Sequence, residues 1–189
     1  MSQKLSLLRL IVERTIARLR GKCDTMAALK AGSKAPTFKL PLLSGGEFEL
    51  TAALAQGPVL LAFFKIGCPV CQMAFPFYER MFAAYGAGAT LVGISQDIAE
   101  NTAKFTEKFG ITFPIALDDT AKYPVSNAYG LTNVPTLFWI APDGTIEISS
   151  VSWDKGTFEL IAEKMSAGAK LPGISMFTPG EQVAAFRPG

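Results

Sequence analysis

Two apolar runs constrain the fold of this chain more than any other feature of its sequence. VLLAFF (59–64) and ATLVGIS (89–95) carry no charged residue, and each is preceded by proline or glycine. Uninterrupted apolar runs of this kind are typical of strands buried on both faces of a sheet. Each run is followed by a stretch of helical composition, at 68–85 and 97–109. The order strand, helix, strand, helix predicts an α/β fold in which parallel strands are joined by helical crossovers.

Shorter elements are expected around these two units. Asp97, with Glu100 three residues later, has the pattern of a helix N-cap, and Gly110 marks the end of that helix. TFKLPLLSGGEFEL (37–50) has two short extended runs around a Ser-Gly-Gly turn, which predicts a hairpin. The other expected elements are a strand at 113–117, a short helix at 118–129 broken at Pro124, a hairpin at 134–151 about an Asp-Gly turn, and a last helix that closes near Gly168.

Composition narrows the functional classes. The chain is 189 residues long and 49% hydrophobic, which suits one full-sized domain with its own core. The net charge of +2 conceals an asymmetry, because residues 1–30 hold seven Lys/Arg and two acidic residues, whereas residues 31–189 hold 11 and 14. Nucleic-acid binding requires a basic face on the folded domain, so no nucleic-acid partner is expected.

The cysteine and histidine content limits the chemistry. The sequence has no histidine, and its three cysteines are Cys23, Cys68 and Cys71. The lack of histidine removes Cys-His and Ser-His catalysis and every imidazole metal site. A structural zinc site commonly takes four Cys or His ligands, and one of these three cysteines lies 45 positions from the other two. No metal is therefore expected.

The first 22 residues have the pattern of a basic amphipathic helix. Apolar residues recur at three-four spacing from Leu5 to Leu19, and residues 4–20 carry five Lys/Arg. This helix is expected to pack on its own domain or on a partner copy, with contact to a membrane surface and disorder as the alternatives. Charged residues interrupt the apolar run early, which argues against a secretory signal. Without a readable signal, the expected location is the cytoplasm.

The predicted organisation has four parts. The basic helix (1–22) is followed by a linker (23–34), in which Cys23 is expected to be a bystander thiol. The folded domain spans residues 35–168. An extension (169–189) with three prolines and three glycines follows, and its sequence suggests no role.

The segment FFKIGCPVC (63–71) places two cysteines at C-x-x-C spacing between the first apolar run and its helix. Such a pair can bind a metal, form a structural disulfide across a turn, or act as a redox-active dithiol. Cys68 falls at the start of the helix with Pro69 in the first turn, where unpaired N–H groups and the helix dipole stabilise a thiolate. Cys71, one turn further in, is placed to attack a mixed disulfide formed on Cys68. The pair is therefore predicted to be a dithiol with Cys68 as nucleophile and Cys71 as resolving cysteine.

Residues 35–167 resemble the thioredoxin superfamily in three matches. FFKIGCPVC follows a buried strand and opens a helix, as the redox motif of that superfamily does. Pro76 stands five residues after Cys71, where thioredoxins carry the proline that kinks the active-site helix. YGLTNVPTLFWIAPDGTIEI resembles the loop in which a proline with a cis peptide bond faces the cysteines, which implies a cis bond between Val134 and Pro135.

The resemblance implies a thioredoxin-like fold, in which a central mixed sheet is flanked by helices. Here an N-terminal β-hairpin, a helix-bearing insertion at 97–129 and an extra N-terminal helix would be added to it. These additions make the chain look more like peroxiredoxin-like redoxins (alkyl hydroperoxide reductase and thiol-specific antioxidant) and cytochrome-maturation thiol-disulfide oxidoreductases than minimal thioredoxin. The resemblance also implies that Val134, Pro135 and Thr136 bind a substrate chain as an added strand beside the cysteines. The Cys68–Cys71 disulfide would be the redox group, with no other cofactor.

Three features differ from the familiar pattern. Ala62 and Ala74 stand before and after the motif where relatives carry carboxylates that assist proton transfer, so no proton acceptor for Cys71 is identified. Gly67 stands where an aromatic residue usually precedes the first cysteine. Lys65 either adds positive potential that favours the thiolate of that cysteine or is a solvent-facing residue at a strand end.

Thiol-disulfide exchange is the favoured function, with a protein thiol or disulfide as substrate and an upstream dithiol as reductant. A peroxiredoxin-like peroxidase, in which a hydroperoxide oxidises Cys68, is the alternative. The P-x-x-x-[ST]-x-x-C motif of peroxiredoxins is absent, because Leu61 and Lys65 hold its positions before Cys68. A redox-silent binding module is the third possibility. The sequence leaves the net direction open, and we take reduction as the expectation.

Overall fold

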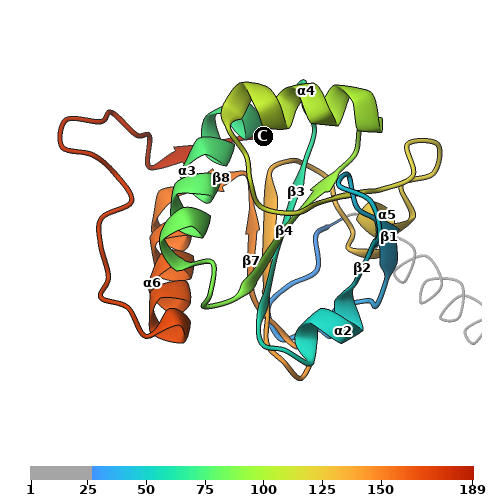
Figure 1. Cartoon of the computed structure of the whole chain (residues 1–189), viewed down its shortest axis with the longest axis horizontal. Helices are drawn as coiled ribbons and strands as arrows, with labels where there is room; N and C mark the ends of the chain where they lie inside the picture. Colours follow the sequence, from blue (N-terminus) through green and yellow to red (C-terminus); the bar gives the residue numbers. More distant parts are fainter. Residues whose placement is uncertain (1–26) are drawn as a thin grey trace, which may run out of the picture.

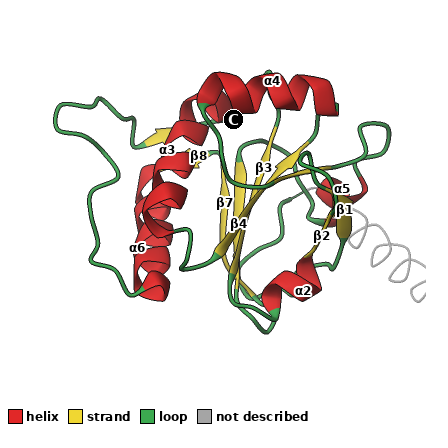
Figure 2. Ribbon diagram, in the orientation of Figure 1, coloured by secondary structure: helices red, strands yellow, loops and turns green. Residues whose placement is uncertain are grey.

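The computed structural model describes residues 27–189, and Figures 1 and 2 show its course. The predicted helix at 1–22 and Cys23 lie outside the described residues. None of the helices in residues 27–189 has the length and apolar character that a membrane crossing requires. The strands are β1 (Lys39–Pro41), β2 (Glu47–Glu49), β3 (Val59–Phe64), β4 (Thr90–Ser95), β5 (Ile115–Leu117), β6 (Thr136–Ile140), β7 (Ile146–Val151), β8 (Trp153–Asp154) and β9 (Phe186–Arg187). The helices are α2 (Leu50–Leu54), α3 (Pro69–Tyr85), α4 (Ala99–Phe109), α5 (Pro124–Ala128) and α6 (Lys155–Ala169).

A five-stranded mixed sheet in the order β5-β4-β3-β6-β7 forms the centre of the protein. β3, β4 and β5 run parallel, whereas β6 is antiparallel to both of its neighbours. Every residue of β3 is buried, which explains why the VLLAFF run has no polar position. The predicted α/β class with a mixed central sheet is confirmed, and the hairpin predicted at 37–50 forms as β1 and β2.

Alternate residues of β3 point into two separate apolar clusters. Leu60, Ala62 and Phe64 belong to the cluster that α3 and α6 cover, and the other three β3 residues belong to the cluster on the opposite face. Figure 1 shows α3 and α6 side by side on one face of the sheet, and α2, α5 and the β1–β2 hairpin on the other. Helices therefore flank the sheet, and the end of β3 leads directly into α3.

The insertion that follows β4 contains α4, β5 and α5. α5 is shorter than predicted, because it begins only at Pro124, where the sequence predicted a break. The buried Asp118 carboxylate at the end of β5 accepts hydrogen bonds from the Ser126 N–H at 2.8 Å and the Ser126 hydroxyl at 2.7 Å. These bonds draw the start of α5 toward β5, and residues 118–123 form a turn instead of helix.

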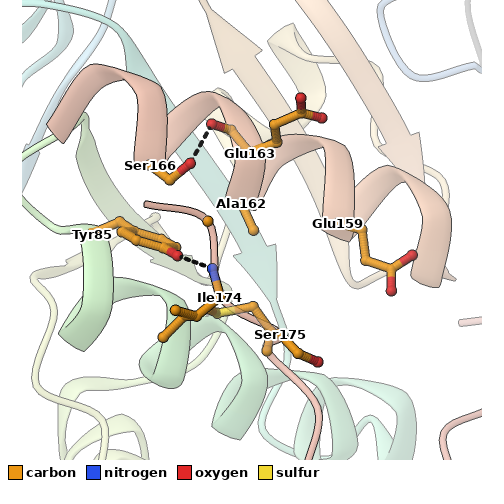
Figure 3. A pocket seen from close by; sticks show the side chains of 9 residues that line it. Tyr85, Glu159, Ala162, Glu163, Ser166, Ile174 and Ser175 are labelled. Carbon is orange, nitrogen blue, oxygen red and sulfur yellow. Dashed lines mark hydrogen bonds between the residues drawn. The ribbon is translucent and has the colours of Figure 1, made fainter. Parts of the chain in front are cut away.

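Residues 170–189, which we call the strap, run back from the end of α6 to the edge of β8, as Figure 2 shows. Near the start of the strap, the Ile174 N–H donates to the Tyr85 hydroxyl at 2.7 Å, beside a cavity between α6 and the strap (Figure 3). Further along, Arg80 forms an ion pair with Glu181 at 2.8 Å. At the far end, β9 pairs antiparallel with β8. The extension is thus tied to the domain at its beginning, middle and end.

A close backbone contact between the α3–β4 loop and α6 predicts a sensitive position. A Cβ at Gly88 would overlap the carbonyl oxygen of Met165. Gly88→Ala is expected to lower the free energy of unfolding by about 1–3 kcal/mol, because the backbone must shift to admit a methyl group. Urea denaturation measures the change. Gly173→Ala is the matched control, since a Cβ there meets nothing within 4 Å, and an equal loss in both variants would contradict the prediction.

Candidate active site

Cys68 lies where β3 passes into α3, and it is the N-cap of that helix. Pro69 occupies the first turn, where the sequence predicted it. The Cys68 thiol is half-buried, and its Sγ accepts a hydrogen bond from the Cys71 N–H at 3.4 Å. A backbone N–H and the N-terminus of a helix are thus both directed at the Cys68 sulfur.

Cys71 lies one turn into α3 and is completely buried. Burial raises the pKa of the Cys71 thiol, a hydrogen bond to the Lys65 backbone offsets part of this, and the charges of Cys68 and Asp97 add to it. Both Cys68 and Cys71 are free thiols in the structure. The two sulfurs therefore have unequal environments, with one accessible at the start of the helix and the other held as a thiol in the core.

The loop before β6 brings a third part of the chain to the cysteines. The Val134–Pro135 peptide bond is cis, as predicted. The Val134 carbonyl accepts a hydrogen bond from the Cys68 thiol at 3.2 Å, across a separation of 66 positions. β6 pairs antiparallel with β3, with Thr136 opposite Phe63, so the start of β6 lies at the same edge of the sheet as the end of β3. The structure thus brings the residues predicted to bind substrate next to the predicted nucleophile.

An open cavity of about 580 Å³ lies between these segments, and Cys68, at the start of α3, forms part of its wall. Lys65, Gly67 and Pro69 line this cavity, whereas Pro76 lies within α3 and outside the lining. The Lys65 side chain is exposed, and its amine lies 5.2 Å from the centroid of the Tyr123 ring. Lys65 therefore has an aromatic partner on the surface. Gly67 leaves the mouth of the cavity open, since nothing lies within 4 Å of where its Cβ would be.

Asp97 lines the same cavity, a placement that the sequence interpretation missed. Its pattern with Glu100 predicted an N-cap, but this was wrong, because the N-cap of α4 is Ile98. The Asp97 carboxylate instead accepts a hydrogen bond from the Ile66 N–H at 2.8 Å. The physical reason is that β3 and β4 are parallel neighbours, so the residues that follow each strand meet at one edge of the sheet. The parallel pairing of these two strands, which the sequence predicted, is the signal from which the position of Asp97 could have been found.

The core behind Cys71 contains a hydroxyl without a hydrogen-bond partner among the described residues. Ala62, Ala74 and Tyr78 are buried in the same apolar cluster as Cys71. The Tyr78 hydroxyl has no hydrogen-bond partner among the described residues. Burial raises the pKa of Tyr78, and the charges of Cys71 and Cys68 raise it further, so the hydroxyl lies within electrostatic range of both sulfurs. The spacing of seven residues from Cys71, two turns along one helix face, is a sequence signal for this neighbour.

Removing this unpartnered hydroxyl should stabilise the protein. Tyr78→Phe keeps the ring and is expected to raise the free energy of unfolding by about 1–3 kcal/mol, because a buried hydroxyl without a partner is costly to desolvate. Chemical denaturation of the reduced protein measures the change. Tyr129→Phe is the matched control, since the Tyr129 hydroxyl donates to the Pro36 carbonyl at 3.0 Å and its loss should not stabilise. A destabilised Tyr78→Phe variant would overturn the prediction.

The raised pKa of Cys71 predicts a loss of stability at alkaline pH. In the unfolded chain the thiol ionises near its ordinary pKa of 9.0, whereas the folded protein keeps the proton. Below this pH, the ionisation of Cys71 therefore takes nothing from the free energy of unfolding. Above it, the free energy of unfolding falls by about 1.4 kcal/mol per pH unit for one such group. Urea denaturation of the reduced protein on either side of this pH measures the slope. Cys71→Ala is the control and should show a shallower slope, so identical slopes would refute the prediction.

Comparison with known proteins places the chain in a family. The model of the AhpC/TSA family matches residues 31–149. The thiol-disulfide oxidoreductase ResA of Geobacillus thermodenitrificans is 35% identical over 123 residues, which cover 64% of this chain and 68% of that protein. ResA of Halalkalibacterium halodurans is 30% identical over 138 residues, which cover 72% of this chain and 76% of that protein.

Solved structures share the arrangement of strands and helices. The thioredoxin domain of a thiol-disulfide oxidoreductase from Bacteroides vulgatus matches with a TM-score of 0.64 at 22% identity, over 72% of this chain and 98% of that domain. Peroxidoxin BcpB from Mycobacterium tuberculosis matches with a TM-score of 0.60 at 24% identity, over 75% of this chain and 97% of that one. These likenesses confirm the predicted thioredoxin-like fold. The family model spans more than half of this chain. The chain therefore belongs to the AhpC/TSA family and is an oxidoreductase of the thioredoxin superfamily.

Proposed function

We propose that the protein is a thiol-disulfide oxidoreductase that reduces disulfides in protein substrates. The observation that carries the proposal is the unequal placement of two neighbouring sulfurs. Cys68 opens to the cavity at the N-terminus of α3, and Cys71 is buried three residues further on. The names of the ResA relatives support the same chemistry.

The proposed cycle has two exchange steps. In the first, the Cys68 thiolate attacks one sulfur of the substrate disulfide, the bond between the substrate sulfurs breaks, and the other sulfur leaves as a thiolate. In the second, Cys71 gives up its proton and attacks the Cys68 sulfur, the bond between Cys68 and the substrate breaks, and the substrate's remaining sulfur leaves as a thiolate. The proton that Cys71 loses ends on one of the two released substrate sulfurs. Two electrons have then passed from the dithiol to the substrate. A separate dithiol must reduce the Cys68–Cys71 disulfide before the next cycle, and the cysteine pair is the one redox group that the cycle needs.

A protein substrate would be oriented by the backbone at Val134. The carbonyl of this residue lies 3.2 Å from the Cys68 sulfur. An extended substrate segment that pairs with Val134 as an added strand would therefore bring its own sulfur to Cys68. Pro135 has no N–H of its own, so it does not compete for the acceptors of such a strand.

Cysteine variants test the assignment of the two roles. Cys68→Ser is expected to lower dithiothreitol-driven reduction of insulin disulfides by roughly a thousandfold or more, because the nucleophile is removed. Cys71→Ser should complete the first step and stall, so a covalent complex with substrate accumulates and appears on non-reducing electrophoresis. Cys23→Ser is the control and should keep the activity of the parent chain.

Hydroperoxide consumption by the same variants separates exchange from peroxidase chemistry. The exchange proposal predicts that insulin reduction far exceeds peroxide turnover and depends on Cys68. Rapid peroxide turnover that requires Cys68, without insulin reduction, would instead identify a peroxidase. If the Cys68 and Cys71 variants matched the parent in both assays, the protein would be a redox-silent binding module.

A further inference from the structure

The strap ends against the candidate active site. Beyond β9, the Gly189 N–H donates to the Ser152 hydroxyl at 2.9 Å, and the Gly189 carbonyl accepts from the Asn133 side-chain amide at 2.9 Å. Figure 1 marks this point with C, beside the start of α3. Gly189 therefore forms part of the wall of the cavity that contains Cys68.

Gly189 lies directly on the backbone of Val134. A Cβ at Gly189 would overlap the Val134 carbonyl oxygen and would come within 3.4 Å of the Pro135 ring. The same carbonyl accepts the hydrogen bond from the Cys68 thiol. It is also the group with which an added substrate strand would pair. The end of the strap and a substrate strand therefore compete for one position.

The two residues after β9 are held less firmly than the strap before them. Upstream, Arg80 pairs with Glu181 at 2.8 Å, and the Trp153 indole N–H donates to the Ala184 carbonyl at 2.8 Å. Beyond β9, in contrast, residues 188 and 189 are exposed. A segment that buries little apolar area opens at a low free-energy cost. Movement of this end alone would leave the upstream anchors in place.

We propose that residues 188 and 189, which follow β9, act as a specificity gate over Cys68. Small disulfides reach the sulfur through the open cavity, whereas a polypeptide must first displace the gate from Val134. The inference rests on the proposed function and deepens it, because it states which disulfides the site admits directly and which it admits only after the strap has moved. Substrate size and backbone pairing, in addition to the reactivity of the disulfide, then determine the rate.

Stoichiometric labelling of Cys68 tests the gate without depending on turnover. In a background of Cys23→Ser and Cys71→Ser, Cys68 is the one thiol left in the chain. It is reacted with dithiodipyridine, which is small, and with an extended peptide whose single cysteine carries a thiopyridyl group. In both reactions the Cys68 thiolate attacks a disulfide sulfur, a mixed disulfide forms, and thiopyridone leaves and is followed by its absorbance.

Two variants open the gate and one serves as control. A chain that stops after residue 187 lacks the gate but keeps β9, and Gly189→Ala pushes the gate off Val134. Both should react with the peptide about tenfold faster, because two hydrogen bonds no longer have to break, and with the small reagent less than about twofold faster. Arg187→Ser changes an exposed side chain, keeps the backbone, and should match the parent.

Unchanged peptide rates in both gate variants would overturn the inference. Equal increases for both reagents would overturn it too, because they would indicate a more reactive thiol instead of a more accessible one. Thermal unfolding checks that each variant is folded, and if the shortened chain is not, Gly189→Ala alone decides. Failure of the proposed function is a separate result, since it would appear as absent insulin reduction by the parent chain while the labelling rates still report the gate.

Discussion

The burial of β3 on both faces is the constraint on which the rest of the structure depends. The residues of β3 alternate between two apolar clusters. A shift of one residue in the register of this strand would therefore move each side chain into the opposite cluster. β3 also pairs with both β4 and β6, and these pairings fix where the strands end. Cys68 follows β3, Asp97 follows β4, and Val134 precedes β6, so all three meet at one edge of the sheet. The same apolar packing that stabilises the fold therefore also holds the site together.

The parts of the site with a local signal were predictable from the sequence. The VLLAFF run, the CPVC spacing and the apolar residues of the 134–151 hairpin each lie within one short segment, and the structure places them as expected. Asp97 was misplaced because its N-cap pattern is also local, whereas its actual partner, the Ile66 N–H, lies 31 positions away. A local pattern predicted the wrong role here, and only the parallel pairing of two strands identifies the correct one.

The strap shows what local patterns cannot supply. Residues 170–189 have no hydrophobic period, and the three prolines among them indicate only that the segment is not a helix. The course of the strap depends on partners scattered along the chain, among them Tyr85, Arg80 and Trp153. None of these residues belongs to a motif, so the approach of Gly189 to Val134 emerges only when the whole domain is assembled.

The charges around Cys71 favour an ordered reaction in the proposed cycle. While Cys68 is a thiolate, its negative charge adds to burial in raising the pKa of Cys71. Once Cys68 enters a mixed disulfide, that charge is gone, and the pKa of Cys71 falls at the step in which Cys71 must attack. Ala62 and Ala74 bring no carboxylate to take up the proton. The electrostatic coupling between the two sulfurs thus makes Cys71 easier to deprotonate only after Cys68 has reacted with the substrate. It favours the order of the two steps without a neighbouring carboxylate.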